Sequence, residues 1–469
     1  MQPHPAWCLC CLLLAAHGCA KKDPLYCDEN TPCTDPERPF CDVEGAYPAS
    51  DGIKKTCIAS PFDAGPSGDA GPDRRVIDIA LGASRTCAVL DDGGLRCWGT
   101  GRLGYPADVG RVGDDEHPFE VGDVRTGGPV RQVALGMDFN CILYAAGNVR
   151  CFGQNGLGQL GYGHTNDVVD EPADIDDVSL GGPARAIVAG TQFTCALLES
   201  GAVRCWGSFD LGCSGYGDGD EQVGDDEVPT DKAAIEVGAA VEQIEAGGTQ
   251  ICALLAGGDG RVRCWGFGVN GALGYGADGE GSLDCVGDDE SPAVRGDVDT
   301  GDPVALIRSY GGSNCVQYDD EKVSCWGDGG SILGYGTATS YGDNEPAGNA
   351  PNVMLGGVAS DLGGGPKCAL MSDGSVRCWG NNDAGQLGLG NIEDIGDNEV
   401  PLDADPIDLG GTVKKLAHGL SSQHMCAIME DDSVRCWGNN EDGQLGLGHR
   451  ENVGDTEAPA DVPAVRVLR

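Results

Sequence analysis

Cysteines recur in this chain as pairs ten or twelve positions apart, and thiolates at a fixed spacing can bind a metal, exchange disulfides or form structural bridges. In CALMSDGSVRCWG, Cys368 and Cys378 enclose a polar turn, and Trp-Gly follows. A metal site would need two further soft ligands for each pair, and the histidines are not spaced to supply them. A redox motif would favour Cys-x-x-Cys, which is absent. The seven pairs are Cys87 with Cys97, Cys141 with Cys151, Cys195 with Cys205, Cys252 with Cys264, Cys315 with Cys325, Cys368 with Cys378, and Cys426 with Cys436.

Turn geometry predicts a structural disulfide within each pair. If residues 372–374 form a three-residue hairpin loop closed by Met371 and Ser375, then Cys368 stands directly opposite Cys378. Counting along the antiparallel ladder makes this a non-hydrogen-bonded pair, with Cα atoms about 4.5 Å apart, within reach of a disulfide. Metal binding and free thiols are the alternatives.

Three hairpins depart from this pattern. The fourth is wider by two residues through GGDG at 257–260, which keeps the register if the loop lengthens. The fifth and seventh carry Glu321 and Asp432 where others have glycine, so we expect their turns to differ somewhat. Two further cysteines, Cys213 and Cys285, lie in the loops of adjacent units, and a bridge between the units is expected, with two unpaired thiols as the alternative.

The repeated unit explains why these pairs recur over residues 75–469. Its period of about 53 to 61 residues suits a four-stranded propeller blade with one long loop. Each aromatic residue after the second cysteine is expected to fill the wedge between neighbouring blades. The domain begins with the inner segment VIDIALG and ends with APADVPAVRVLR, an outer segment. We therefore expect the C-terminal strand to complete the blade begun by Val76 and so to close the ring.

Composition supports an all-β protein outside the cytosol. The 469 residues include 78 glycines and 25 prolines, which disfavour long helices. Asp and Glu number 74 against 30 Lys and Arg, a net charge of −44 that repels nucleic acid and anionic lipid. Twenty-four cysteines indicate an oxidising compartment.

The N-terminal residues agree with export. The apolar run CLCCLLLAA and the small residues before Cys19 resemble a bacterial lipoprotein signal peptide over residues 1–19, which predicts lipidation of Cys19 and a place in the bacterial cell envelope. Ordinary secretion is the alternative. The run is too short to span a membrane, so we expect membrane association only through the lipid anchor.

Two short segments precede the repeats. Residues 20–58 contain few apolar side chains and four cysteines, Cys27, Cys33, Cys41 and Cys57, which predict a small disulfide-rich segment with three possible connectivities. A zinc site is the alternative. Residues 59–74 are rich in Pro, Gly and Asp and are expected to be a flexible linker.

The sequences VRCWGNNDAGQLGLG at 376–390 and VRCFGQNGLGQLGYG at 149–163 resemble the regulator of chromosome condensation (RCC1) repeat family. The resemblance implies a seven-bladed β-propeller with a shared-strand closure. It implies no chemistry, because functions of this fold lie in surface loops. Family members include a nuclear guanine nucleotide exchange factor and a secreted bacterial inhibitor of β-lactamases. Export, cysteine pairing and acidity argue against the nuclear role here.

An acidic phrase such as GDDEVP recurs once in each unit. Because a propeller places equivalent positions at equal radius on one side, we expect these carboxylates to form a ring that attracts a basic partner. Structural turns are the plainer interpretation, and calcium binding is a further alternative. The candidate ring comprises Asp114, Asp115, Glu116, Asp170, Glu171, Asp225, Asp226, Glu227, Asp288, Asp289, Glu290, Asp343, Glu345, Asp397, Glu399, Asp455 and Glu457.

No enzyme motif is present: HExxH, GxSxG and P-loop sequences are all missing. His418 and His424 are expected to be polar surface residues rather than catalytic ones. The sequence therefore predicts a non-enzymatic, monomeric interaction module without a cofactor, whose partner is another protein. A secreted hydrolase or lyase using carboxylates and a calcium-stabilised structural protein are the alternatives.

Overall fold

The computed structural model describes residues 74–106, 109–276, 284–420 and 422–469, together with three short strands nearer the N-terminus. The predicted signal peptide, Cys19, Cys33 and the linker before residue 74 lie outside the described residues. The chain divides into two units, Met1–Ala70 and Gly71–Arg469. In the first unit, β1 (Tyr26–Cys27), β3 (Lys55–Ile58) and β2 (Phe40–Cys41) pair in that order, with Cys41 opposite Cys57.

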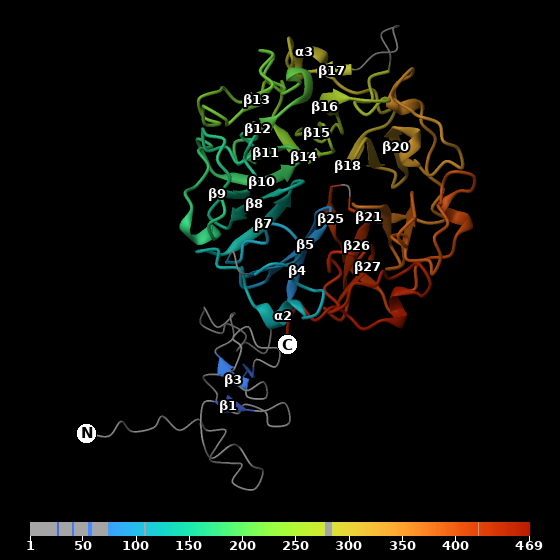
Figure 1. The fold of residues 1–469 in the computed structure, drawn as a ribbon. Helices are drawn as coiled ribbons and strands as arrows, with labels where there is room; N and C mark the ends of the chain where they lie inside the picture. Colours follow the sequence, from blue (N-terminus) through green and yellow to red (C-terminus); the bar gives the residue numbers. More distant parts are fainter. Residues whose placement is uncertain are drawn as a thin grey trace. The chain divides into compact units, whose positions relative to one another are not determined.

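The second unit contains seven small antiparallel sheets arranged around a centre (Figure 1), as predicted. Each begins with an inner strand and continues outward through a hairpin. The sheets comprise β4 (Val76–Leu81), β5 (Arg85–Leu90) and β6 (Leu95–Gly99); β7 (Val130–Leu135), β8 (Phe139–Tyr144) and β9 (Val149–Gly153); β10 (Ala184–Ala189), β11 (Phe193–Leu198), β12 (Val203–Ser208) and β13 (Gln222–Val223); β14 (Val241–Ala246), β15 (Gln250–Leu255), β16 (Val262–Gly268) and β17 (Asp284–Val286); β18 (Val304–Tyr310), β19 (Ser313–Tyr318) and β20 (Val323–Gly327); β21 (Ala359–Gly363), β22 (Lys367–Met371) and β23 (Val376–Trp379); and β24 (Val413–Leu416), β26 (His424–Met429) and β27 (Val434–Gly438).

Helical structure is confined to single turns in the loops. These are α2 (Pro118–Val121), α3 (Pro292–Arg295) and the 3-10 turns η2 (Pro172–Asp174), η3 (Asp210–Gly212), η4 (Gly329–Ser331), η5 (Ala347–Asn349), η6 (Pro401–Asp403) and η7 (Pro459–Asp461). Proline at the first helical position of α2 and α3 suits such short turns, since its missing N–H has no helical partner there. Among the described residues, no helix has the length and apolar character needed to cross a membrane.

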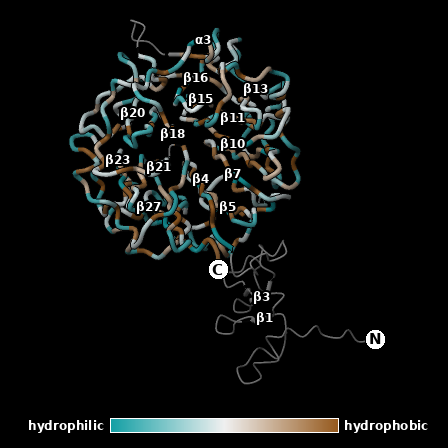
Figure 2. Tube along the Cα trace, turned by 180° about the vertical axis from the view of Figure 1, so that it is seen from behind, coloured by the Kyte–Doolittle hydropathy of each residue, from teal (hydrophilic) through white to brown (hydrophobic). Residues whose placement is uncertain are grey.

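Burial follows the position of each strand within its blade. Every residue of β5 and of β8 is buried, because the second strand lies between two neighbouring sheets. The inner strand β4 alternates buried with partly exposed residues, since one of its sides faces the central channel. The hydropathy colouring of Figure 2 follows the same division, with apolar segments along the strands and polar segments in the outer loops.

The aromatic residues after the second cysteines pack between blades, as predicted. Trp98, Trp206, Trp265, Trp326, Trp379 and Trp437 are almost fully buried. Each ring lies against a glycine of the preceding blade where a Cβ atom would overlap it, for example Trp206 against Gly161. In the second blade Phe152 takes this place and lies against Gly104. Around the propeller, each large aromatic side chain thus packs where the facing glycine has no side chain.

The hairpin disulfides have the geometry expected from the turn. Cys368 is the register partner of Cys378, their Cα atoms are 4.0 Å apart, and Gly374 closes the turn with φ +82°. The fourth hairpin keeps Cys252 opposite Cys264 despite its longer loop. The other hairpin bridges join Cys87 to Cys97, Cys141 to Cys151, Cys195 to Cys205, Cys315 to Cys325, and Cys426 to Cys436. A bridge between Cys213 and Cys285 joins the third and fourth blades, with Cα atoms 5.4 Å apart.

One expectation about the hairpins is wrong. Glu321 and Asp432 adopt the same left-handed conformation as the glycines they replace, with φ +70° and +64°. The N–H of Glu321 bonds to the Tyr318 carbonyl as that of Gly374 does to Met371. The hairpin register imposes this conformation, and these side chains bear its steric cost.

The predicted closure through a shared C-terminal strand is also wrong. Val465 bonds to Val434 within the seventh sheet, just as Val124 bonds to Leu95 within the first. The first blade therefore supplies its own outer segment, and no strand is missing from it. Closure comes instead from the inner side, where the short strand β25 (His418–Gly419) pairs in parallel with β4. The first and last sheets accordingly lie side by side, blue and red in Figure 1.

Candidate functional site: the acidic turns and the central channel

The paired cysteines of the blades contribute bridges rather than a chemical site. The second cysteine of each pair lies on the third strand of its blade, is almost fully buried and is bonded to the cysteine opposite it on the second strand. These residues are Cys97, Cys151, Cys205, Cys264, Cys325, Cys378 and Cys436. Since both sulfur atoms of every pair are used in a bond, the alternatives of metal binding and free thiols do not describe these hairpins. The candidate site must be sought elsewhere.

In six of the seven blades the acidic phrase forms a turn at the end of the third strand, after a residue that bridges to that strand. Val112, for example, bridges to Gly99, and the turn begins at Gly113. We call the turns that begin at Gly113, Gly224, Gly287, Gly342, Gly396 and Gly454 the acidic turns. In all six, the glycine is buried, the next and third residues are half-buried and the residue between them is exposed.

Each acidic turn is held by the preceding blade through one repeated hydrogen bond. The N–H of Gly163 donates to the Gly224 carbonyl at 3.1 Å, and the N–H of Gly448 donates to the Gly113 carbonyl at the same distance. Equivalent bonds run from Gly217 to Gly287, from Gly276 to Gly342, from Gly336 to Gly396 and from Gly390 to Gly454. Because the same contact recurs around the ring, the six turns occupy equivalent positions.

The second blade does not share this arrangement. Val169 stands where the other blades have the turn glycine, and it is 52% exposed. Asp170 and Glu171, which were expected to belong to the ring, lie in a shorter loop, and Glu171 forms an ion pair with Arg125. A cavity of about 380 Å³ between the first two blades is lined by Phe152, Val168 and neighbouring residues. The sequence phrase VVDEPA therefore does not mark an acidic turn.

Three of the acidic turns concentrate carboxyl groups. In Asp114-Asp115-Glu116, Asp225-Asp226-Glu227 and Asp288-Asp289-Glu290, one ligand atom from each residue lies within 4.8 Å of the others, so each trio could hold a cation. Burial, followed by the neighbouring Asp115, raises the pKa of Glu116 to about 7. Burial and then Asp289 likewise raise the pKa of Glu290 to about 7. Ionisation of these glutamates at neutral pH is therefore unfavourable, because they are partly buried and lie beside other carboxylates.

The third blade adds an open acidic hollow of about 730 Å³ beside its turn. Asp218 and Asp220, from the phrase DGDGDE, line it and both form ion pairs with Lys232. Asp225, Asp226 and Glu227 line the same hollow. A single lysine thus faces several carboxylates, and the hollow retains an excess of negative charge.

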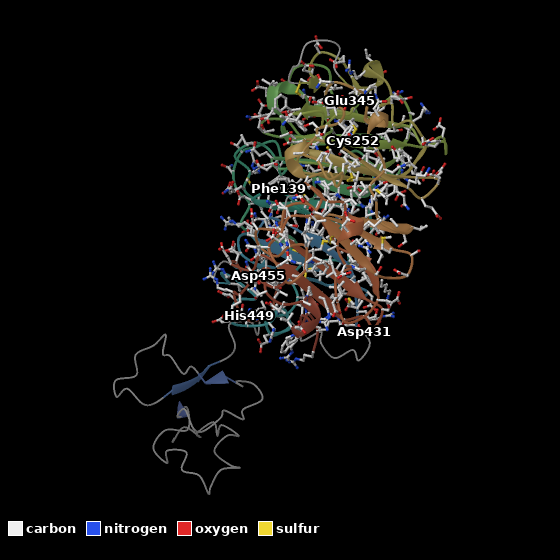
Figure 3. The ribbon with its side chains drawn as sticks, turned by 90° about the vertical axis from the view of Figure 1, so that its right-hand side faces the viewer. Phe139, Cys252, Glu345, Asp431, His449 and Asp455 are labelled. Atoms are coloured by element: carbon white, nitrogen blue, oxygen red, sulfur yellow. A yellow bond between two sulfur atoms is a disulfide. The ribbon has the colours of Figure 1, made fainter. Side chains whose placement is uncertain are left out.

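The strand direction places the acidic turns and the hairpin turns at opposite ends of each blade. In the seventh blade, β27 runs from the hairpin turn that contains Asp431 to Gly438, which bridges to Val453 beside Asp455. Asp455 and His449 lie toward one side of the propeller and Asp431 toward the other in Figure 3, which also labels Phe139, Cys252 and Glu345. The two sides of the propeller therefore carry different sets of loops.

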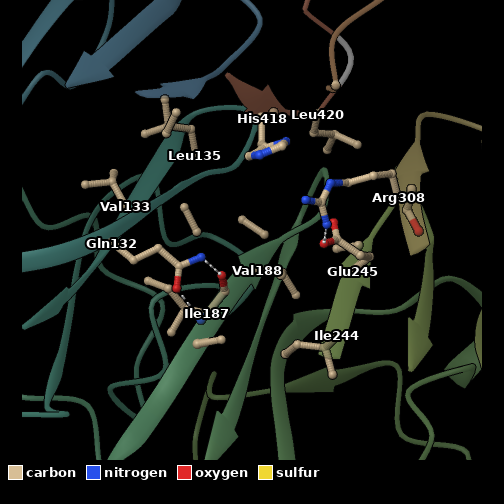
Figure 4. A pocket seen from close by; sticks show the side chains of 18 of the residues that line it. Gln132, Val133, Leu135, Ile187, Val188, Ile244, Glu245, Arg308, His418 and Leu420 are labelled. Atoms are coloured by element: carbon tan, nitrogen blue, oxygen red, sulfur yellow. Dashed lines mark hydrogen bonds and ion pairs between the residues drawn. The ribbon is translucent and has the colours of Figure 1, made fainter. Parts of the chain in front are cut away.

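The central channel contains a second candidate site, a cavity of about 310 Å³ lined by the inner strands (Figure 4). Two glutamines hold neighbouring inner strands together. The side chain of Gln132 donates to the Ile187 carbonyl at 2.9 Å and accepts from the Ile187 N–H at 3.0 Å. It thus makes the two bonds that the backbone of a neighbouring strand would otherwise make. Gln243 makes the same pair of bonds to Ile307. These bonds fix the channel wall.

Charged groups gather on one side of this cavity. Arg308 lies 3.0 Å from Glu245 and 3.2 Å from Asp361, and it also donates to the Leu362 carbonyl. Burial raises the pKa of Glu245, although Arg308 favours its ionised form. Burial and the charges of Arg308 and Lys415 lower the pKa of His418 well below its usual range, so its imidazole is neutral at pH 7.

Both histidines differ from the expectation of a polar surface role. His418 lines the channel, where its Nδ1 is buried and has no hydrogen-bond partner among the described residues. His424 is fully buried and lies 2.7 Å from the Thr86 hydroxyl, and burial lowers its pKa to about 3. Sequence reasoning missed the channel residues Glu245 and Arg308. Their signal is a charge in the inner segments IEAG and IRSY, where other blades have IALG or IVAG.

The seven repeated sheets and their ring of inter-blade contacts define a β-propeller assembled from one recurring unit. The chain contains repeats of the regulator of chromosome condensation (RCC1) type. The model of that repeat matches residues 76–104, 130–159, 184–213, 368–386 and 417–444.

Similar sequences and a similar solved structure come from a plant, a human and a yeast. The chain is 27% identical over 408 residues to the Ultraviolet-B receptor UVR8 of Arabidopsis thaliana, covering 84% of this chain and 83% of that one. It is 28% identical over 312 residues to the E3 ubiquitin-protein ligase HERC2 of Homo sapiens but spans only 6% of that protein. The crystal structure of Prp20p from Saccharomyces cerevisiae, studied with its binding to Gsp1p and histones, matches with a TM-score of 0.59 at 20% identity, over 78% of this chain and 85% of that one.

Proposed function

We propose that this protein is a non-enzymatic, exported interaction module that binds a basic protein through its acidic turns. The observation that carries the proposal is the lack of cations around these carboxylates. Within the described part of the chain, only Asp114 and Glu171 of the candidate ring have an ion-pair partner within 4.0 Å, namely Arg111 and Arg125. A surface of uncompensated carboxylates attracts positively charged partners and raises their encounter rate.

The raised pKa values of Glu116 and Glu290 support the same role. Their ionised forms are destabilised by burial and by neighbouring carboxylates, so a lysine or arginine of a partner would relieve that repulsion. The free protein already bears the free-energy cost of this repulsion, so its removal on binding would increase the affinity for the partner. The relatives agree in general terms, since Prp20p has been studied for its binding to other proteins.

Export is the second part of the proposal. The bridges found in all seven hairpins, and the bridge between Cys213 and Cys285, suit a compartment where thiols are oxidised. A lipid on Cys19 would anchor the propeller in the cell envelope. If this assignment is right, Cys19→Ala should move the protein from the membrane fraction to the soluble fraction. Equal partition of the two forms would contradict it.

Calcium stabilisation is a second candidate, favoured by the three carboxylate trios whose ligand atoms lie within 4.8 Å of one another. Adding calcium to chelator-treated protein should then raise its melting temperature. Replacing Asp115, Asp226 and Asp289 together by Asn should abolish that increase. No change with calcium would leave only the protein-binding role for these turns.

Affinity capture from an extract of the source cells tests the main proposal. The oxidised propeller should retain basic proteins at low salt and release them at high salt, because exposed charge pairs are screened. A variant with Asp115→Asn, Asp226→Asn and Asp289→Asn should retain much less. These changes are conservative, since Asn344 and Asn398 occupy the same turn position in other blades. If the variant retains basic proteins as well as the parent does, the acidic turns do not bind the partner.

A further inference from the structure

One layer of side chains on the inner strands departs from the repeated pattern of the blades. In each blade one inner-strand residue stands opposite the first cysteine of its hairpin. These residues are Ala80, Ala134, Val188, Glu245, Arg308 and Gly363 by strand register, and Ala417 through its bond to Cys426. Five of the seven positions are small or aliphatic. The two charged ones belong to adjacent blades and pair with each other at 3.0 Å.

The fold does not require this charge pair. Five blades build the same layer with small or aliphatic residues, and apolar residues can replace a buried ion pair without loss of stability. The small residues on the facing strands, Ala80, Ala134 and Val188, leave room beside Glu245 and Arg308. The cavity of about 310 Å³ occupies that room and lies within the size range of small-ligand sites. Apolar walls on one side and a few polar groups on the other are typical of such sites.

The unused hydrogen-bonding capacity of the cavity favours a donor. Arg308 directs its N–H groups to Glu245, Asp361 and the carbonyls of Leu362 and Ile307. The Oε1 atom of Glu245 accepts bonds from Arg308 and Gln243, whereas its Oε2 atom has no protein partner among the described residues. The imidazole of His418 also has none there, and a buried polar group left unpaired is costly. A ligand that donates hydrogen bonds would satisfy the Oε2 atom of Glu245, which can only accept them when it is ionised.

The sign of the charge points to a cation. Glu245 and Asp361 share the single guanidinium of Arg308, and Lys415 is paired with Asp78 at 2.8 Å. Arg185 also lies near the cavity, but it donates to the backbone carbonyls of Val241 and Glu242 rather than to a carboxylate. Glu242 also lines the cavity and has no ion pair among the described residues. The balance is therefore negative, and an anionic ligand would meet carboxylates while the arginine donors are already engaged.

We propose that the channel cavity binds a primary ammonium group carried on a short aliphatic chain. The ammonium group lies beside Glu245, and the chain packs against Ala80, Ala134 and Val188. Figure 4 shows Glu245, Arg308 and His418 converging on the same space. The occupant is either a free aliphatic amine or the lysine side chain of a bound protein, because both present the same chemistry.

Titration calorimetry of the full chain with pentylamine tests this site, with pentanoate and pentan-1-ol as matched probes. Pentylamine should bind saturably, and neither control should match its affinity. Glu245→Gln keeps the shape of the side chain and should weaken pentylamine binding by about tenfold or more. Ala80→Leu fills the cavity without changing any charge and should weaken it similarly. The Ala80→Leu variant still tests the site if the Glu245→Gln variant fails to fold. Glu430→Gln, on an exposed hairpin turn, should leave binding unchanged.

Competition identifies the occupant. If an acetylated and amidated Gly-Lys-Gly peptide displaces pentylamine, the site takes a lysine side chain, and if that peptide does not bind, the site takes a free amine. Either result supports the proposal. Equal binding of pentanoate, or pentylamine binding that both channel variants leave unchanged, would overturn it. The acidic-turn variant should bind pentylamine normally, so failure here is distinguishable from failure of the proposed partner surface.

Discussion

The backbone N–H of Gly448 donates to the carbonyl oxygen of Gly113 at 3.1 Å, although the two residues lie near opposite ends of the domain sequence. This bond joins the seventh blade to the first. Five other junctions use the same pair of backbone groups, so the closing junction, which also contains the pairing of β25 with β4, includes the contact found at those junctions. The acidic turns depend on this contact, because each of them is fixed by the blade before it.

Substitution of the turn glycine tests that dependence. Gly113 has φ +101°, and a Cβ atom there would overlap the Gly443 carbonyl. We expect Gly113→Ala to lower the free energy of unfolding by about 2 to 4 kcal/mol through strain and overpacking. Gly101 has a similar φ of +95° but open space around it, so Gly101→Ala should cost only about 1 kcal/mol. Equal losses in urea unfolding would contradict this role of the junction.

Removal of the bridges should separate two kinds of disulfide. Replacing Cys368 and Cys378 by Ser opens a short loop and should cost about 2 to 3 kcal/mol, and replacing Cys213 and Cys285 opens a longer loop and should cost about 4 kcal/mol in the chain-entropy model. Chemical denaturation of both double variants measures the difference. A smaller loss for the bridge between blades would show that the closed ring already constrains those loops.

The left-handed conformation of Glu321 offers a stabilising substitution. Glycine tolerates φ +70°, whereas glutamate bears steric strain there. Glu321→Gly should therefore raise the free energy of unfolding by up to about 1 kcal/mol, the net of relieved strain and added chain entropy. Asp432→Gly should gain less, because Asp432 also pairs with Lys414 at 2.8 Å. A melting temperature lower than that of the parent for Glu321→Gly would refute the strain argument.

The raised pKa values of Glu116 and Glu290 predict a pH-dependent stability. The folded protein holds their protons up to about pH 7, above the usual pKa of 4.5 for a glutamate in an unfolded chain. Their favourable contribution is complete below that lower value and is lost as the pH rises through 7. Relative to the parent, the Glu116→Gln and Glu290→Gln variants should thus be more stable at about pH 8 than at about pH 4, by up to about 1 kcal/mol each after solvent screening.

Thermal unfolding at several pH values measures this difference. Asp115→Asn should produce part of the same effect, because Asp115 is the neighbouring carboxyl that raises the pKa of Glu116. A gain that is the same at every pH would show that these glutamates ionise normally.

The sequence predicts what local geometry determines. Counting from a three-residue turn was enough to place Cys368 opposite Cys378, because an antiparallel ladder has a fixed alternation. The same reasoning failed at Glu321, since the register of the sheet outweighs the local preference for glycine. It also failed for the closure, because the outer segment ending each unit bonds backward to its own blade, as Val465 does to Val434.

The central channel lay beyond prediction for a different reason. Glu245 and Arg308 are far apart in the sequence, and only the ring brings their strands together. The unusual charges at these positions were visible, but their pairing depends on the order of blades around the axis. The departure of the second blade was similarly hidden, because VVDEPA keeps an Asp-Glu pair before a proline, although Val169 replaces the turn glycine and the loop is shorter.

The most direct test of the central claim compares charge loss at the two ends of the blades. A lysine-rich peptide is titrated into the parent, into the triple variant Asp115→Asn, Asp226→Asn, Asp289→Asn, and into the triple variant Glu199→Gln, Asp319→Asn, Glu430→Gln at exposed hairpin turns. Both variants lose three charges, so net charge is matched. The account predicts about tenfold weaker binding for the acidic-turn variant and little change for the hairpin variant, with the difference shrinking at high salt. Equal weakening of both variants would contradict it.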